Sequence, residues 1–353
     1  MAATSCQKGN FVKFIAYMQV IGIILVVFGH SFHEYPDGHH GTSMLIYRMM
    51  FSFRMPTFMF VSGFLMAYTT FLNQKKHSLS VNAFVLTKVK RLLVPYFVLT
   101  LVTFYPRAAM NSMADDAIEP SVAGLLKGFL YMDNMPIPLF WFIQASFLLL
   151  VFTYSFIYLS NRSGLNKNVS QAILIILFLI LPLFEIRNVQ FFSVGYAVKH
   201  GLFFCLGIVY AHRLKSIDAR IHWESPLLLA LFMAVWASLF FMTEETPFYP
   251  LCQLAGICMV ISLAHMLEYR QIRILDHLIG ANYIIFLLSW YFNVLSQQVL
   301  AHVVSLPWYV HTICSLFFGI YVPYFFYRYL MSHQCSKAVR CLSFLLGQKT
   351  NKY

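Results

Sequence analysis

The chain has 353 residues, of which 59% are hydrophobic and only 11% are charged, and its formal net charge is +12. Soluble domains carry about 25% charged residues, so this composition excludes an ordinary soluble protein. Apolar runs close to the roughly 20 residues that cross a bilayer recur along the whole length. The sequence therefore predicts an all-α, polytopic transmembrane helical bundle. The positive charge gathers in loops on one side, which indicates membrane topology rather than nucleic-acid binding.

The first apolar segment, Phe11–Phe32, has Lys8 shortly before it and Lys13 at its start, in the manner of a signal peptide. No small-residue cleavage site follows it and further spans come next, so we expect an uncleaved first span. Ten spans are expected, at residues 11–32, 49–72, 91–107, 138–160, 169–184, 194–211, 226–242, 249–267, 279–300 and 308–330. We expect one integral-membrane domain over residues 1–353, with residues 331–353 as a cytoplasmic tail.

Lysine and arginine are distributed unequally between the loops. If the amino terminus is cytoplasmic and the spans alternate, few of the 25 basic residues fall on the outer side, namely Arg48, Arg54, Arg107, Lys127, Arg187 and Lys199. Such asymmetry in short loops fixes the orientation of a membrane protein. We therefore expect both termini in the cytoplasm and a multi-pass protein of the plasma (inner) membrane.

The seven cysteines show no CxxC pairing, and most of them lie in apolar spans. A free thiol in such a position behaves as a small hydrophobe. The sequence therefore predicts neither a disulfide framework nor a zinc site built on cysteine.

The first span ends in polar residues, "FGHSFHEYPDGHH". His30 is either an interfacial residue that caps the helix or a general base, because imidazole titrates near neutrality. Glu34 lies on the same helical face if the helix continues that far, and it would orient the ring and raise its basicity. A zinc site made by His30, His33, Glu34 and the pair His39 and His40 is a third alternative. Their spacing matches no zinc signature, and no metal is expected.

The second span opens with "FRMPTFMFVSGFL". Arg54 lies just inside the span and requires a carboxylate or a substrate oxygen as its partner, while Pro56 fits the first turn of a helix. Ser62 and Gly63 form a small-residue patch that would let another helix or a slender ligand come close, and helix packing is the simpler explanation. Arg54, Ser31 and Ser62 are the candidate substrate-binding residues.

The third span begins with "KVKRLLVPYF". Lys88, Lys90 and Arg91 are expected at its cytoplasmic edge. Such a cluster commonly fixes topology and faces lipid headgroups. The alternative is a phosphate clamp, because lysine and arginine bind phosphate oxygens through charge-assisted hydrogen bonds.

Five segments, "IGIILVVFGHS", "FRMPTFMFVSGFLM", "KVKRLLVPYF", "PLFWFIQASFLL" and "GLFFCLGIVYA", occur in this order between about residues 11 and 330. In order and spacing they resemble the acyltransferase-3 family, and most closely its fucose 4-O-acetylase-like branch of integral-membrane O-acyltransferases. The resemblance implies transfer of an acetyl or other acyl group from cytoplasmic acyl-CoA to an extracytoplasmic acceptor, commonly a glycan hydroxyl. It also implies that His30 is the catalytic histidine and that Lys88, Lys90 and Arg91 face the acyl-CoA.

Three positions depart from the family pattern. Gln19 stands where relatives usually carry a basic residue, Arg54 replaces the histidine of "FHMP", and Ser289 in "IIFLLSWYF" replaces the histidine of "LLHW". These departures would alter donor or acceptor specificity, or they would mark a non-catalytic relative. We hypothesise that Arg54 supplies in space the positive charge that is missing at Gln19.

The two sites are expected on opposite faces of the membrane. The span from Lys13 to His30 covers roughly 25 Å, so a nucleotide held at the cytoplasmic rim cannot touch His30. We expect a narrow channel through which the pantetheine arm carries the thioester. His30 would deprotonate the acceptor hydroxyl or carry the acyl group itself, and Arg54 or Ser31 would stabilise the oxyanion.

The expected partners are acyl-CoA, with acetyl-CoA the first choice, a glycan or glycolipid acceptor of the cell envelope, and the bilayer. A glycolipid or small-molecule transporter would share the composition, but internal repeats or broken helices with midplane charges are not evident. A non-catalytic relative of the acyltransferases is the other alternative.

Overall fold

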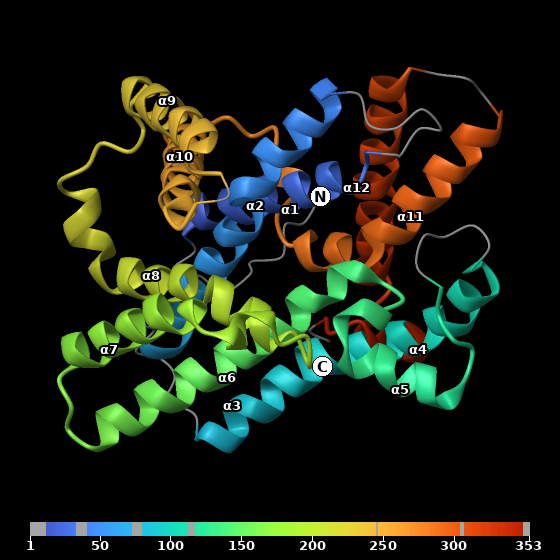
Figure 1. Ribbon diagram of the computed structural model, residues 1–353, viewed down its shortest axis with the longest axis horizontal. Helices are drawn as coiled ribbons and strands as arrows, with labels where there is room; N and C mark the ends of the chain where they lie inside the picture. Colours follow the sequence, from blue (N-terminus) through green and yellow to red (C-terminus); the bar gives the residue numbers. More distant parts are fainter. Residues whose placement is uncertain are drawn as a thin grey trace.

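The computed structural model describes residues 12–32, 41–72, 80–111, 117–244, 246–303 and 307–348. Apart from one isolated bridge between Tyr131 and Phe191, the regular structure of these residues is helical. Figure 1 shows the helices coloured in chain order. Helices α1 and α2 lie near the centre, and the pairs α9–α10 and α11–α12 lie to either side.

The helices are α1 (Lys13–Gly29), α2 (Gly41–Ala67), α3 (Val81–Lys88), α4 (Val94–Ala109), α5 (Val122–Leu130), α6 (Trp141–Arg162), α7 (Lys167–Ile180), α8 (Val194–Asp218), α9 (Pro226–Thr243), α10 (Tyr249–Tyr269), α11 (Asn282–Val303), α12 (Trp308–Ser332) and α13 (Lys337–Leu345). A π-helical turn, Tyr68–Leu72, continues α2, and a second one, Val89–Leu93, joins α3 to α4. Short 3₁₀ turns occur at Met132–Asn134, Pro138–Phe140, Leu181–Leu183, Glu185–Asn188 and Asp276–Leu278.

Seven segments of the described chain are long and apolar enough to cross a membrane, namely Ser43–Leu72, Pro138–Arg162, Val194–Asp218, Pro226–Thr243, Tyr249–Tyr269, Asn282–Leu300 and Trp308–Ser332. The segments Lys13–Gly29 and Lys167–Leu183 are apolar but shorter. All of these coincide with expected spans. The predicted all-helical, multi-span fold is thus confirmed, while the total of ten spans and the location of the termini stay predictions.

Helix α1 lies between two hydrophobic cores. Phe14 and Met18, in its first half, belong to a core that also contains buried residues of α2, α6, α7, α8, α9 and α10. Ile23 and Val27, in its second half, belong to a core made with α4, α11 and α12. Because α1 is apolar all round, both of its faces are buried, and its far end is held between helices that are distant in sequence.

Helices α1 and α11 run in the same direction, and hydrogen bonds link them at one end. The Asn293 side-chain amide donates to the carbonyl oxygen of Val27 at 3.2 Å, and that of Gln297 donates to the carbonyl oxygen of His30 at 3.0 Å. We refer to this end of the bundle as the His30 end.

At the opposite end, which we call the Lys13 end, polar contacts tie α1 to the segment that precedes α11. The Tyr17 hydroxyl donates to the Asp276 carboxylate at 2.6 Å, and Lys13 Nζ lies 3.5 Å from the same carboxylate. The Tyr17 hydroxyl and then the Lys13 ammonium hold the pKa of Asp276 below its ordinary value.

Helix α2 contradicts one expectation from the sequence and agrees with another. The expectation for Pro56 is wrong, because α2 begins at Gly41 and Pro56 lies inside the helix. The small-residue patch does serve helix packing: a Cβ at Gly63 would collide with the carbonyl oxygen of Phe204 in α8, and one at Gly207 in α8 with that of Phe60. Glycine at both positions lets the two backbones meet.

The chain after α12 folds back as α13. The Gln334 side chain donates to the Ser343 hydroxyl at 3.1 Å. Gly347, in the left-handed region at φ 67°, packs against the carbonyl oxygen of Arg91. The part of the expected tail that the structure describes therefore packs near the beginning of α4.

Candidate functional site

His30 ends helix α1 and is fixed through its backbone. Its N–H bonds to the carbonyl oxygens of Val26 and Val27, and its own carbonyl accepts from Gln297. The apolar run of α1 thus delivers the imidazole to the end of the bundle with little freedom in its main chain. Any group that acts from this position needs little reorganisation of the backbone.

Arg54, from the middle of α2, is buried beside His30, with only 3% of its surface exposed. A Cβ at Gly29 would collide with the guanidinium, which shows how closely it packs on the end of α1. Its Cζ atom lies 4.7 Å from the centroid of the Phe51 ring and 5.5 Å from that of Tyr47. Among the described residues, Arg54 Nε and Nη1 have no hydrogen-bond partner. Buried donors left unused are costly, so this guanidinium indicates a site for an anionic oxygen.

His30 and Arg54 line one cavity of about 360 Å³. Small-molecule sites are commonly roughly 300–1,000 Å³, so this volume suits a ligand of moderate size. The other lining residues are Val26, Tyr47, Phe51, Met55, Arg107, Ile118, Met132, Asp133, Met135, Pro136, Pro138, Leu139, Trp141, Tyr196, Phe286 and Trp290. The cavity is thus built by α1, α2, α4, α6, α8 and α11 together with the segment between α5 and α6 and with Ile118, which precedes α5.

The lining combines large aromatic rings with few polar groups. Trp141, Tyr196 and Trp290 offer broad apolar surfaces, and Arg107 and Asp133 bring opposite charges. Mostly apolar walls with a few convergent polar groups are typical of ligand sites.

A buried polar network positions the segment that carries Asp133. The Tyr96 hydroxyl and the Gln144 amide donate to the carbonyl oxygen of Phe129 at 2.8 Å and 3.0 Å. The Ser193 hydroxyl donates to the Gln144 side-chain oxygen at 2.7 Å. This network joins α4, α6 and α8 to the end of α5, so the cavity wall rests on the rigid part of the bundle.

The basic segment, Lys88, Lys90 and Arg91, lies at the start of the continuous helical run that leads through α4 to Arg107. Lys90 and Arg91 are exposed within the π-helical turn Val89–Leu93, and the Tyr283 hydroxyl donates to the carbonyl oxygen of Arg91 at 2.8 Å. Arg107, which lines the His30 cavity, is roughly 24 Å further along the helix at 1.5 Å per residue. The structure therefore separates the basic segment from His30 by most of the length of the bundle.

The cavity extends from His30 toward the Lys13 end. Phe286, part of its wall, is three residues from Tyr283, which touches the backbone of Arg91. Lys88, Lys90 and Arg91 do not line this cavity. A continuous channel from the basic segment to His30 therefore stays a prediction.

The remaining candidate residues lie elsewhere. The Ser31 hydroxyl is buried and donates to the carbonyl oxygen of Val27 at 2.8 Å. Ser62 is half-buried, and neither serine lines the His30 cavity. Glu34, His33, His39 and His40 lie outside the described residues. Within the described part of the chain, no three His, Cys, Asp or Glu side chains gather as a metal site would require.

The three departures from the family pattern have different surroundings. The Arg54 guanidinium lies at Gly29, roughly 15 Å along α1 from Gln19 at 1.5 Å per residue, so it does not occupy the place of a basic side chain at position 19. Ser289 is fully buried, and its hydroxyl has no hydrogen-bond partner among the described residues.

Several residues of the cavity were not singled out from the sequence. Asp133 belongs to a loop that carried no motif, while Tyr196 and Trp290 sit in apolar runs rich in aromatic residues. Trp141 stands in "PLFWFIQASFLL", one of the segments that carry the resemblance. Arg107 offered another signal, as one of the few basic residues expected on the outer side.

The fold and the cavity define a multi-pass helical membrane protein with a buried histidine–arginine site. The sequence model of the Acyltransferase domain, acyltransferase-3, matches residues 12–328, so the chain belongs to this family of membrane acyltransferases. Neither the curated proteins nor the solved structures contain a match to the chain. The fucose 4-O-acetylase-like branch stays a prediction.

Proposed function

We propose that this protein is a membrane O-acyltransferase that moves an acyl group, acetyl first of all, from cytoplasmic acyl-CoA to a hydroxyl of an extracytoplasmic glycan or glycolipid. One observation carries the proposal. In a chain of the acyltransferase family, His30 shares a cavity with the buried Arg54, whose Nε and Nη1 have no partner among the described residues.

The chemistry follows from these two side chains. In one route, the His30 imidazole takes the proton of the acceptor hydroxyl while the hydroxyl oxygen attacks the thioester carbonyl carbon. The carbon–sulfur bond then breaks, and the leaving thiolate receives the proton from the imidazolium. In the other route, an imidazole nitrogen attacks the thioester carbonyl carbon and the thiolate leaves with the proton of the ring, after which the acceptor oxygen attacks the acyl-imidazole and the hydroxyl proton returns to the ring. In both, the Arg54 guanidinium stabilises the oxyanion of the tetrahedral intermediate. Glu34 would orient the ring.

The walls of the cavity fit a sugar acceptor. Pyranose rings have apolar C–H faces, which pack on indole and phenol rings such as those of Trp141, Tyr196 and Trp290. Their hydroxyls require hydrogen-bonding groups at the edge of the ring, and Arg107 and Asp133 provide these groups in the same cavity.

The donor would approach from the Lys13 end. In the proposed topology of ten spans, this end and both termini are cytoplasmic. Lys90 and Arg91 are exposed there, where they would bind the phosphates of acyl-CoA. The pantetheine arm would then reach His30 through the bundle, along the wall formed by Phe286.

The proposal is tested by measuring the rate at which labelled acetyl groups are transferred from acetyl-CoA by membranes that contain the wild-type protein or His30→Ala. We expect the wild type to label a surface or lipid-linked glycan and the variant to lose about 10²–10⁴-fold in rate, the usual contribution of a general base. His222→Ala, at an exposed histidine outside the cavity, is the matched control.

Equal labelling by the wild type and by His30→Ala would remove His30 from the mechanism. Binding of acetyl-CoA by the wild type without any transfer would favour the non-catalytic alternative.

A further inference from the structure

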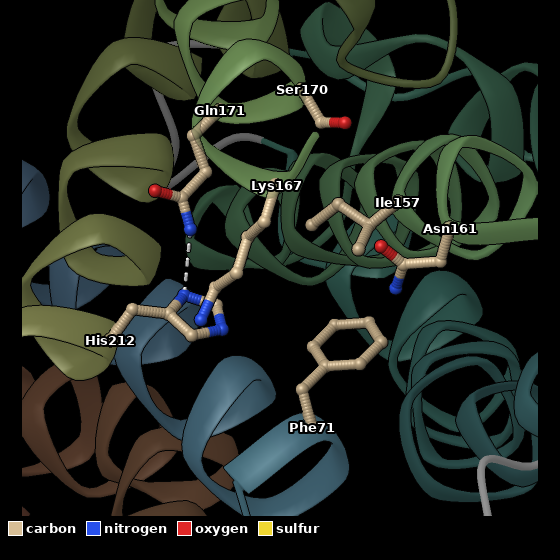
Figure 2. Close-up of a pocket in the computed structure, with 7 residues that line it drawn as sticks. All are labelled: Phe71, Ile157, Asn161, Lys167, Ser170, Gln171 and His212. Carbon is tan, nitrogen blue, oxygen red and sulfur yellow. Dashed lines mark hydrogen bonds between the residues drawn. The ribbon is translucent and has the colours of Figure 1, made fainter. Parts of the chain in front are cut away.

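A second cavity, of about 180 Å³, lies between the ends of α6, α7 and α8 and the π-helical turn after α2 (Figure 2). Its lining residues are Phe71, Ile157, Asn161, Lys167, Ser170, Gln171 and His212. This cavity belongs to the Lys13 end, because the ring of Phe14 lies 6.4 Å from that of Tyr210, two residues before His212. It shares no residue with the His30 cavity.

The polar lining of this cavity suits an anion. Lys167 supplies a positive charge, and Asn161 and Ser170 supply neutral hydrogen-bonding groups, while no carboxylate belongs to the lining. Lys167 is also the first residue of α7, after the helix cap Asn166. The amino-terminal end of a helix carries a partial positive charge that favours a bound anion, and at α7 the Asn166 side chain accepts from one of the free N–H groups, that of Asn168, at 2.8 Å.

His212 is held so that one ring nitrogen remains for a ligand. Its Nδ1 atom lies 2.8 Å from the Gln171 side-chain amide and 3.0 Å from the carbonyl oxygen of Ile208. Figure 2 shows the first of these contacts and Lys167 extending toward the same ring. When the Gln171 amide donates to Nδ1, the ring proton lies on Nε2, which can then donate to a phosphate oxygen.

A stack of aromatic rings connects this cavity to the basic segment. Phe71, in the cavity wall, stacks on Tyr154 with ring centroids 5.5 Å apart, and Tyr154 stacks on Phe84 at 3.8 Å. Lys88 Nζ lies 4.9 Å from the centroid of the Phe84 ring. A ligand that places one phosphate group at Lys88 and Lys90 could therefore place another in the cavity.

We propose that the cavity at Lys167 and His212 is a binding site for a phosphate group. Two ligands could bring that group to this end of the bundle. One is the 3′-phosphate of the coenzyme A nucleotide, an assignment that rests on the proposed function. The other is the headgroup of an anionic phospholipid in the adjoining leaflet.

The test uses the full-length protein in nanodiscs of zwitterionic lipid. Calorimetry would compare coenzyme A with 3′-dephospho-coenzyme A for the wild type, Lys167→Gln, and Arg213→Gln as the control for an exposed cation next to His212. If the nucleotide is the ligand, the wild type and Arg213→Gln bind coenzyme A about tenfold more tightly than the dephospho form. Lys167→Gln loses that preference, as expected for one charge-assisted hydrogen bond.

A parallel arm replaces part of the lipid with phosphatidylglycerol and measures thermal unfolding. If the lipid is the ligand, phosphatidylglycerol raises the unfolding temperature of the wild type and of Arg213→Gln but not of Lys167→Gln, and the two nucleotides bind equally. Absence of any Lys167-dependent effect in both arms would overturn the phosphate site. If neither nucleotide binds at all, the proposed function fails, whereas the lipid arm still tests the cavity.

Discussion

The two ends of the bundle hold their positive charge in different ways. At the His30 end, the Arg54 guanidinium is buried in a cavity with aromatic walls. At the Lys13 end, Lys90 and Arg91 are exposed on a helical turn. A buried charge acts strongly on a nearby oxyanion because little water screens it. Exposed charges interact weakly one by one, which suits a ligand that must bind and leave. We therefore expect the His30 end to determine kcat and the Lys13 end to determine the KM for the donor.

Apart from the loss of His30 itself, Arg54→Met is expected to lower kcat the most. Methionine keeps much of the side-chain volume but removes the charge that would stabilise the oxyanion. We expect kcat to fall by about 10²–10³-fold, as when one oxyanion donor is lost. The same change removes a buried charge, so the thermal unfolding temperature should rise or stay constant. Steady-state kinetics and thermal unfolding of the same preparation measure both effects.

A pair of glycine variants controls for the loss of charge. Gly29→Ala displaces the Arg54 guanidinium without removing it, whereas Gly41→Ala meets no atom within 4 Å. Gly29→Ala should lower kcat and Gly41→Ala should not. Full activity in both Arg54→Met and Gly29→Ala would show that the guanidinium takes no part in the reaction.

A smaller and different effect is expected at the Lys13 end. The double variant Lys90→Ala/Arg91→Ala should raise the KM for acyl-CoA by about tenfold or more through lost phosphate contacts, with little change in kcat. Initial rates measured over a range of acyl-CoA concentrations separate the two constants. Arg162→Ala, at an exposed arginine that ends α6, is the control. A fall in kcat with unchanged KM would reverse the roles assigned to the two ends.

The smallest effect concerns stability at the Lys13 end. The pKa of Asp276 is lowered by the Tyr17 hydroxyl and by Lys13. A carboxyl group with a lowered pKa stabilises the folded state above its ordinary pKa of about 3.9 and ceases to do so as the pH falls through the folded value. Wild type should therefore unfold at a slightly higher temperature than Asp276→Asn at pH 7, and the difference should vanish in acid. A difference that persists at acidic pH would mean that the carboxylate charge is not its source.

The sequence predicted most spans because each is a long apolar run, a signal that needs no partner helix. It missed the beginning of α2, since residues 41–48 mix polar and apolar side chains and extend beyond the apolar run. It also missed α5 and the turn at Met132–Asn134, which form part of the site through contacts with Tyr96 and Gln144. Those contacts join segments that are distant in the chain, and no local pattern reports them.

The sequence predicted only those residues of the candidate site whose polarity contrasts with the apolar sequence around them. His30 and Arg54 are polar groups attached to apolar runs, which is costly in a membrane and therefore noticeable. Tyr196 and Trp290 are ordinary in a chain with 18% aromatic residues. Their place in one cavity results from the packing of α8 and α11 around α1, which the sequence alone does not reveal.

Sealed proteoliposomes of known orientation show whether the donor enters at the Lys13 end while His30 reacts at the other. Labelling of the exposed Cys341 in α13 with an impermeant maleimide reports which end faces outward. We expect acyl transfer only when acyl-CoA is supplied on the side where Cys341 is accessible. Transfer from acyl-CoA confined to the His30 side would contradict entry of the donor at the Lys13 end.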